Sequence, residues 1–162
     1  NDAPKDTESA EAWKSSGIPE HKIAFLPKSN NWWGPAGLTG PCGPCSEMFY
    51  YIGKGKPAKK SNPETDEANW FEIWNDVFMQ FNKNKEGKFE QLLQKNVDTG
   101  LGLERVTRVL NGFESVFETD LLKPIYQAAE KLCKADCTSK HAVHSLRIIT
   151  DHLRAATFIL GD

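Results

Sequence analysis

Residues Val97–Val106, with the sequence VDTGLGLERV, carry the side chains of this chain that are best suited to chemistry. Gly100 and Gly102 lack a Cβ, so a ligand can approach their backbone closely, and a helix that begins after them would favour an anion at its N-terminus. Arg105 would lie in the first turn of that helix, where its guanidinium can contact phosphate or stack on a base. Asp98 can accept a charge-assisted hydrogen bond from a substrate ammonium. The pattern predicts a nucleotide-type site, although a tight turn followed by a solvated arginine fits the same spacing.

Two common phosphate-binding motifs do not match this segment. A Rossmann turn needs a helical crossover and a later acid for the ribose, and a P-loop needs a Gly-Lys-Ser/Thr sequence. The segment has neither feature.

The segment must be positioned by strands before it and a helix after it. Trp70–Phe81 is aromatic and β-branched and lies between polar stretches, which indicates a strand. Asn82–Gly87 is typical of a hairpin turn, and a second strand is expected over Phe89–Val97. A helix is expected over Gly102–Leu110, with Gly112 as its natural end.

The remaining elements are expected from composition and capping residues. The first part of the chain predicts a short helix at Glu8–Ser16, a short strand at His21–Leu26, an irregular Gly- and Pro-rich loop at Asn30–Ser46, a strand at Glu47–Ile52 and a polar loop at Gly53–Asn69. Helices are expected over Leu121–Cys133 and over Ser145–Leu160, with Ser145 as the N-cap of the latter. Strands followed by helices favour an α+β fold.

The overall composition limits the classes of function. Lys and Arg number 20 against 22 Asp and Glu, so the chain lacks the basic character of a self-sufficient nucleic-acid binder. Apolar runs fall well short of the roughly 20 residues that span a bilayer, and the polar N-terminus is not a secretory signal. We therefore expect no membrane partner, reduced cysteines and a cytoplasmic location. The sequence leaves the oligomeric state open.

Several segments together resemble one family. TGPCGPCSEMFY, FEIWNDVFMQFN, VDTGLGLERV and SLRIITDHLRAATFIL occur in this order in alanyl-tRNA synthetases, and DTESAEAW and NNWW match earlier stretches of that family. VDTGLGLERV is similar to the third signature motif of class II aminoacyl-tRNA synthetases. The resemblance implies part of a class II antiparallel sheet with flanking helices. It places the C-terminal part of the catalytic domain at residues 1–120 and the start of a helical tRNA-recognition region at residues 121–162.

The resemblance also implies roles for individual residues. Asp98 would hold the amino group of alanine, Trp33 and Val77 would wall the methyl pocket, and Gly100 would leave space above it. Gly102 and Arg105 would bind ATP, with Glu72 and Asn75 near its magnesium ion. Arg147 and Arg154 would contact tRNA, although a helical pairing of Arg147 with Asp151 is the alternative for the first of them. Trp32 is expected in the core.

Glu72 and Asn75 pose a geometric problem for this assignment. Residues three apart on a regular strand point to opposite faces of the sheet. Both can therefore serve one site only if the strand is bulged or twisted between them. The alternatives are an exposed strand acid for Glu72 and a satisfied core amide for Asn75.

The implied reaction is the ATP-dependent activation of alanine and its transfer to tRNA(Ala), with ATP as substrate and Mg²⁺ as cofactor. The first two class II motifs are absent, and the last helix would run almost to the final residue. We therefore expect a part of the catalytic domain that is inactive by itself. The alternative is a non-catalytic tRNA-binding or interaction module derived from the same domain.

The cysteines offer two further interpretations. Cys42 and Cys45 form the dithiol sequence of thioredoxin, but a probable strand follows them where that fold needs a helix, so we reject a redox role. A zinc site, and with it a small zinc-binding domain, would need four residues at a spacing that matches no common finger: Cys133, Cys137, His141 and His144. We favour cysteines at a helix end and histidines in a loop, and expect no metal site of this kind.

Overall fold

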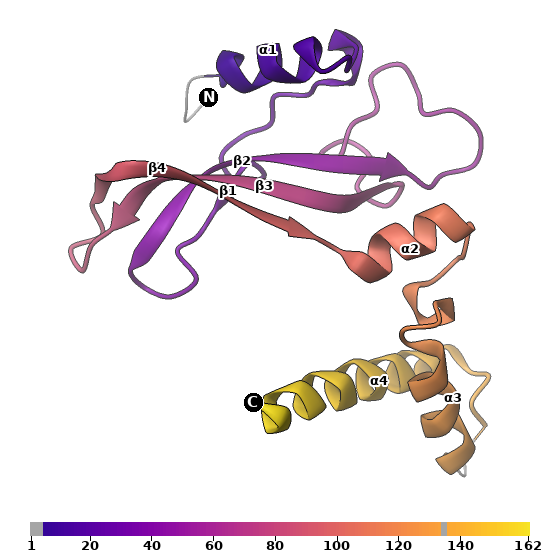
Figure 1. Ribbon diagram of the computed structural model, residues 1–162. Helices are drawn as coiled ribbons and strands as arrows, with labels where there is room; N and C mark the ends of the chain where they lie inside the picture. Colours follow the sequence, from indigo (N-terminus) through magenta and orange to yellow (C-terminus); the bar gives the residue numbers. More distant parts are fainter. Residues whose placement is uncertain (1–4, 134–135) are drawn as a thin grey trace. The chain divides into compact units, whose positions relative to one another are not determined.

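The computed structural model describes residues 5–133 and 136–162 and confirms the α+β class. The chain forms two compact units, Asn1–Gly102 and Leu103–Asp162, called here the sheet unit and the helical unit. Figure 1 shows the antiparallel strands of the first and the helices of the second. The expected domain division between residues 120 and 121 stays a prediction.

The sheet unit is built on a four-stranded antiparallel sheet with the order β1-β2-β3-β4. Its strands are β1 (Trp32–Trp33), β2 (Gly40–Tyr51), β3 (Trp70–Lys83) and β4 (Phe89–Leu101). The helix α1 (Thr7–Ser15) lies over the sheet, where the indole Nε1 of Trp13 donates a hydrogen bond of 2.7 Å to Ser46 Oγ. The small core of the sheet is formed by Cys45, Val77 and Met79.

The expected strands around the hairpin are confirmed, and both are longer than expected. Asn84 shapes the turn, because its side-chain oxygen accepts a 2.9 Å hydrogen bond from the Lys88 N–H. β4 continues four residues beyond Val97, so Asp98 and Gly100 lie within the paired strand and not at its end.

The Gly- and Pro-rich stretch Asn30–Ser46 was expected as a loop, and this expectation is wrong for much of its length. β1 and the first half of β2 lie within it, and the expected strand at Glu47–Ile52 is the second half of β2. Gly43 makes this possible, because a Cβ there would lie 1.8 Å from the carbonyl oxygen of Phe78 on β3. The pairing of β2 with β3 shifts register between Cys42 and Cys45, and such irregularities accommodate proline.

The strand expected at His21–Leu26 is also wrong. Residues Glu20–Lys22 form a 3-10 turn (η1), held by a 2.8 Å hydrogen bond from the Lys22 N–H to the Pro19 carbonyl. Residues 23–27, all within the described part, are not paired with a strand. The loop expected at residues 53–69 is confirmed.

The helical unit contains α2 (Leu103–Asn111), the 3-10 turn η2 (Val116–Glu118), α3 (Lys123–Leu132) and α4 (Lys140–Gly161). Gly112 ends α2 with a φ of 67°. α4 begins earlier than expected, because its N-cap is Ser139 and not Ser145: Ser139 Oγ accepts from the Ala142 N–H at 3.2 Å. Leu122 and Leu146 are buried here, as are Thr119 and Thr150. Among the described residues, no helix is long and apolar enough to cross a membrane.

Candidate active site

A bulge in β3 resolves the geometric problem of Glu72 and Asn75. Asn75 is paired with Glu47 and Glu72 with Phe49, so the stretch from 72 to 75 contains one residue more than the opposing stretch of β2. Ile73 is the extra residue, and its carbonyl accepts a 3.0 Å hydrogen bond from the Gly102 N–H. Because directly paired residues share a face and Glu47 and Phe49 are two apart, Glu72 and Asn75 point to the same face.

The same face extends onto β4. Val77 is paired with Asp98, and Asn75 is paired with Gly100. Val77 is buried, whereas Asp98 is exposed. A Cβ at Gly100 would meet no atom of the described chain within 4 Å, so there is open space above this glycine. An acid, an apolar wall and an open backbone position thus lie next to one another.

Glu47 of β2 joins this face through a small hydrogen-bond network. Its Oε1 accepts from Asn75 Nδ2 at 3.3 Å and from the Cys45 thiol at 3.2 Å. Burial raises the pKa of the Glu47 carboxyl, the Cys45 hydrogen bond lowers it, and the charge of Glu72 raises it. The other side-chain oxygen of Asn75, Oδ1, is buried and has no hydrogen-bond partner among the described residues.

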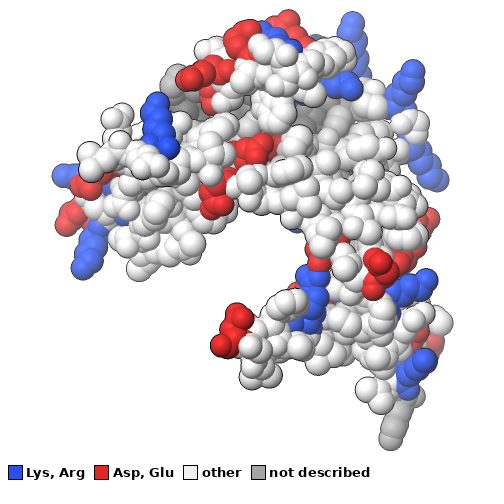
Figure 2. Space-filling model, viewed as in Figure 1, with Lys and Arg blue, Asp and Glu red and all other residues white. Residues whose placement is uncertain are grey.

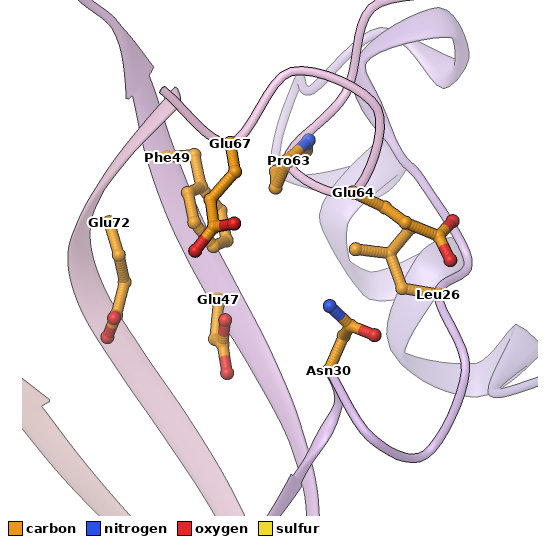
Figure 3. A pocket seen from close by; sticks show the side chains of 8 residues that line it. All are labelled: Leu26, Asn30, Glu47, Phe49, Pro63, Glu64, Glu67 and Glu72. Atoms are coloured by element: carbon orange, nitrogen blue, oxygen red, sulfur yellow. The ribbon is translucent and has the colours of Figure 1, made fainter. Parts of the chain in front are cut away.

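A cavity of about 290 Å³ opens beside these residues. Glu47, Phe49 and Glu72 enter it from the strands, while other residues come from the loops that border it (Figure 3). The loop residues in its lining are Leu26, Asn30, Pro63, Glu64 and Glu67. Four acidic residues therefore line one space and give its surroundings a negative charge.

Trp33 lies in β1, where it is paired with Gly43 of β2 and is 39% exposed. The neighbouring Trp32 packs against aromatic rings, with its ring centre 5.8 Å from that of Phe81 and 5.4 Å from that of Phe89. Trp32 is half-buried in this aromatic cluster and is not among the buried residues of the core. The place of Trp33 in the same pocket as Val77 and Asp98 stays a prediction.

The two halves of the run Val97–Val106 fall in different units. Asp98, Gly100 and Gly102 belong to the sheet unit, and Arg105 lies in the first turn of α2 in the helical unit, as expected. Within the helical unit, Glu104 forms an ion pair with Arg154 of α4. Arg154, expected to contact tRNA, is thus engaged with the residue next to Arg105.

Arg147 also has an internal partner in the helical unit. Its guanidinium lies over the ring of Phe117, 5.6 Å from the ring centre. Figure 2 shows an acidic patch near the middle of the visible face of the sheet unit, with further acidic side chains at its margins beside the basic ones. This distribution places negative charge at the centre of that face.

None of the four cysteines, all of which lie in the described part of the chain, forms a disulfide. Burial, followed by the hydrogen bond to Glu47, raises the pKa of Cys45 to about 12. Burial also raises the pKa of Cys42. A redox-active thiol has a lowered pKa, so these raised values agree with the rejection of a thioredoxin-like role.

The second group of possible metal ligands differs from expectation in one respect. His141 and His144 lie in α4 and not in a loop. A hydrogen bond with Cys133 is the largest of the effects that raise the pKa of Cys137 to about 11. Within residues 5–133 and 136–162, no three His, Cys, Asp or Glu side chains are placed to hold a metal ion. The absence of zinc stays a prediction.

Sequence reasoning missed Glu47 as a member of the site. An acid within a strand, two residues from a buried cysteine, was the available signal, because alternation turns both toward the same face. The Gly- and Pro-rich interpretation of the preceding residues concealed that alternation. Glu64 and Glu67 were also missed, since they reach the cavity from a polar loop.

Comparison with known proteins places this site in a family. The family model of class II tRNA synthetases (A) matches residues 2–162. The chain is 48% identical to the alanine–tRNA ligase of Treponema denticola, covering 99% of this chain and 27% of that protein. It is 44% identical to the alanine–tRNA ligase of Borrelia hermsii, and this match covers 98% of this chain and 27% of that protein. It is 42% identical to the alanine–tRNA ligase of Rubrobacter xylanophilus, and this match covers 99% of this chain and 19% of that protein.

The chain spans about a quarter of the length of the first two of these relatives. The match nevertheless includes both the sheet unit with its acidic face and the helical unit with Arg105. The chain therefore belongs to the class II tRNA synthetase (A) family.

Proposed function

We propose that the protein to which this chain belongs is an alanine–tRNA ligase, and that the sheet unit carries its alanine pocket. In the first step, a carboxylate oxygen of alanine attacks the α-phosphorus of ATP, and pyrophosphate leaves. In the second, the 3′-terminal ribose hydroxyl of tRNA(Ala) attacks the carbonyl of the alanyl-adenylate, and AMP leaves. Neither step needs a covalent enzyme intermediate, so catalysis rests on positioning and charge stabilisation.

The observation that carries this proposal is the pairing of Val77 with Asp98 beside the open position at Gly100. Asp98 would accept hydrogen bonds from the alanine ammonium. Val77 would contact the methyl group, with Trp33 as a second wall, and Gly100 leaves room above the substrate. A buried apolar wall next to an accessible acid suits a small amino acid with an apolar side chain.

The donor set near Asn75 fits a magnesium ion that accompanies ATP. Mg²⁺ prefers oxygen ligands and is commonly held by one or two carboxylates together with substrate phosphates. Glu72 offers a carboxylate and Asn75 offers a buried oxygen without a hydrogen-bond partner among the described residues. When bound, the ion neutralises phosphate charge. Gly102 would admit the nucleotide close to the backbone, and Arg105 would contact its phosphates or base.

For the transfer step we propose that Arg147 and Arg154 of α4 contact tRNA. Both are cations on one helix, and phosphate contacts supply much of the affinity for RNA. Arg147 can hold its ring contact and still present N–H groups to a phosphate. Arg154 would have to share its guanidinium with Glu104.

Alanine-dependent ATP–pyrophosphate exchange in the full-length protein tests the proposal. We expect Asp98→Ala to abolish exchange mainly through weaker alanine binding, and Arg105→Ala to do so through weaker ATP binding. Wild-type exchange in either variant would refute the assigned role. A full-length protein without alanine-dependent exchange would refute the function and favour a non-catalytic module.

A further inference from the structure

We propose that Glu47 is a positioning residue for Asn75. Its carboxylate, held by the Cys45 thiol, fixes the amide of Asn75 so that Oδ1 is presented to the metal ion of Mg·ATP. This inference rests on the proposed function, and it concerns a residue that was not among those expected to form the site.

The first observation is that two donors meet on one oxygen. Glu47 and Asn75 are direct cross-strand partners, and Oε1 of Glu47 accepts from Asn75 Nδ2 at 3.3 Å. The Cys45 Sγ, two residues earlier on β2, donates to the same oxygen at 3.2 Å. All three residues lie on the face that continues to Glu72 and the cavity.

The second observation is the orientation that this contact imposes. A primary amide has a donor end and an acceptor end, and the hydrogen-bond network decides which way it points. A carboxylate only accepts, so it takes the donor end of Asn75. The acceptor end, Oδ1, is then left buried without a hydrogen-bond partner among the described residues. A buried polar atom in this state is unfavourable unless a ligand satisfies it.

Glu47 is better suited to this supporting role than to direct metal binding. Its Oε1 already accepts two hydrogen bonds inside the sheet. Glu72, by contrast, lies on the neighbouring strand and lines the same cavity as a second carboxylate. Removal of a residue that hydrogen-bonds to a metal ligand and orients it typically lowers the metal affinity about 10- to 100-fold.

Two substitutions separate support from direct binding. Glu47→Gln keeps a carbonyl oxygen that can accept from Asn75 Nδ2 but removes the negative charge. Glu47→Leu removes the acceptor while keeping a similar volume, so the amide of Asn75 is free to turn. Glu47→Ala serves as a smaller alternative should the leucine variant not fold.

The experiment is isothermal titration of the full-length protein with ATP in the presence of Mg²⁺, with ATP in the presence of EDTA, and with alanine. For Glu47→Leu we expect the Kd of Mg·ATP to rise about 10-fold, while those of metal-free ATP and alanine stay within about twofold. For Glu47→Gln we expect the Kd of Mg·ATP to stay within about threefold of wild type. In an Asn75→Ala background, Glu47→Leu should have no further effect.

Three results would overturn the inference. Equal losses of Mg·ATP affinity in the Gln and Leu variants would make Glu47 a direct ligand of the ion. Unchanged Mg·ATP affinity in both the Leu and Ala variants would remove any role. Parallel losses for all three ligands would indicate a general structural defect. A wild-type protein without alanine-dependent exchange would contradict the proposed function itself, which is a separate outcome.

Discussion

In the sheet unit, the carboxylates of Glu47 and Glu72 line a cavity beside an amide oxygen that no described residue satisfies. In the helical unit, Arg154 is paired with Glu104, and Arg147 lies over the ring of Phe117. The first region therefore holds one buried amide oxygen without a hydrogen-bond partner among the described residues, whereas in the second both Arg147 and Arg154 have partners within the fold.

This difference separates two kinds of functional residue. A strand ladder fixes backbone positions, so it holds Asn75 and Asp98 in place without using their side chains in the pairing. Exposed helices offer less support, and their long basic side chains gain stability from internal partners. We therefore expect substitutions on the sheet face to impair amino acid activation most, and substitutions of the helical arginines to have smaller effects.

The largest effect is expected from Asp98→Asn, which keeps the shape of the side chain and removes its charge. Hydrogen bonds to charged groups contribute about 1.5–3 kcal/mol, so kcat/KM for alanine in the exchange assay should fall about 10- to 100-fold. Asp76→Asn is the matched control, because Asp76 is one position from Val77 on β3 and so points to the opposite face, where it accepts from Thr99 Oγ1 at 2.7 Å. Equal losses in the two variants would contradict the assignment of the substrate face.

A smaller effect is expected from Gly100→Ala. The added methyl group enters open space in the fold but would occupy the proposed alanine pocket, where one methylene is worth about 1–3 kcal/mol. We expect the KM for alanine to rise about 10-fold with an unchanged circular dichroism spectrum and thermal midpoint. Gly43→Ala is the contrasting variant: its Cβ would lie 1.8 Å from the Phe78 carbonyl oxygen, so it should lower the thermal midpoint sharply. An unchanged KM in Gly100→Ala would remove this glycine from the pocket.

Features of the site that depend on local sequence patterns could be predicted, whereas features that depend on pairing between strands could not. Aromatic and β-branched composition located β3, and the glycines and Arg105 located the start of α2. The sequence also posed the question of Glu72 and Asn75, but the bulge at Ile73 that answers it depends on pairing with β2. β2 itself was missed in part, because the close approach permitted by Gly43 has no signal in a single sequence.

The next effect concerns the helical unit and the pair Glu104–Arg154. The side chains are 23% and 33% exposed, so we expect the pair to contribute about 1 kcal/mol. Glu104→Gln and Arg154→Met should each speed amide hydrogen exchange about fivefold in the peptides of α2 and α4. The double variant should be no worse than either single variant, and additive losses would show that the two side chains do not act as a pair.

The smallest effect is expected from Arg147→Leu, measured as affinity for tRNA(Ala). Loss of one phosphate contact should lower the slope of log affinity against log salt by roughly 0.7–0.9 and weaken binding only a few-fold at physiological salt. Alanine-dependent exchange should not change, because it does not involve tRNA. An unaltered salt slope would limit Arg147 to its packing against Phe117.

The most direct test of the account is the affinity of the full-length protein for a non-hydrolysable alanyl-adenylate analogue, in which a sulfamoyl group replaces the phosphate. This ligand occupies the amino acid and nucleotide positions at once, without chemistry. We expect tight binding by wild type and by Asp76→Asn, and binding at least about 10-fold weaker for Asp98→Asn. Equal affinity in all three proteins would contradict the claim that the face carrying Asp98 holds the aminoacyl group.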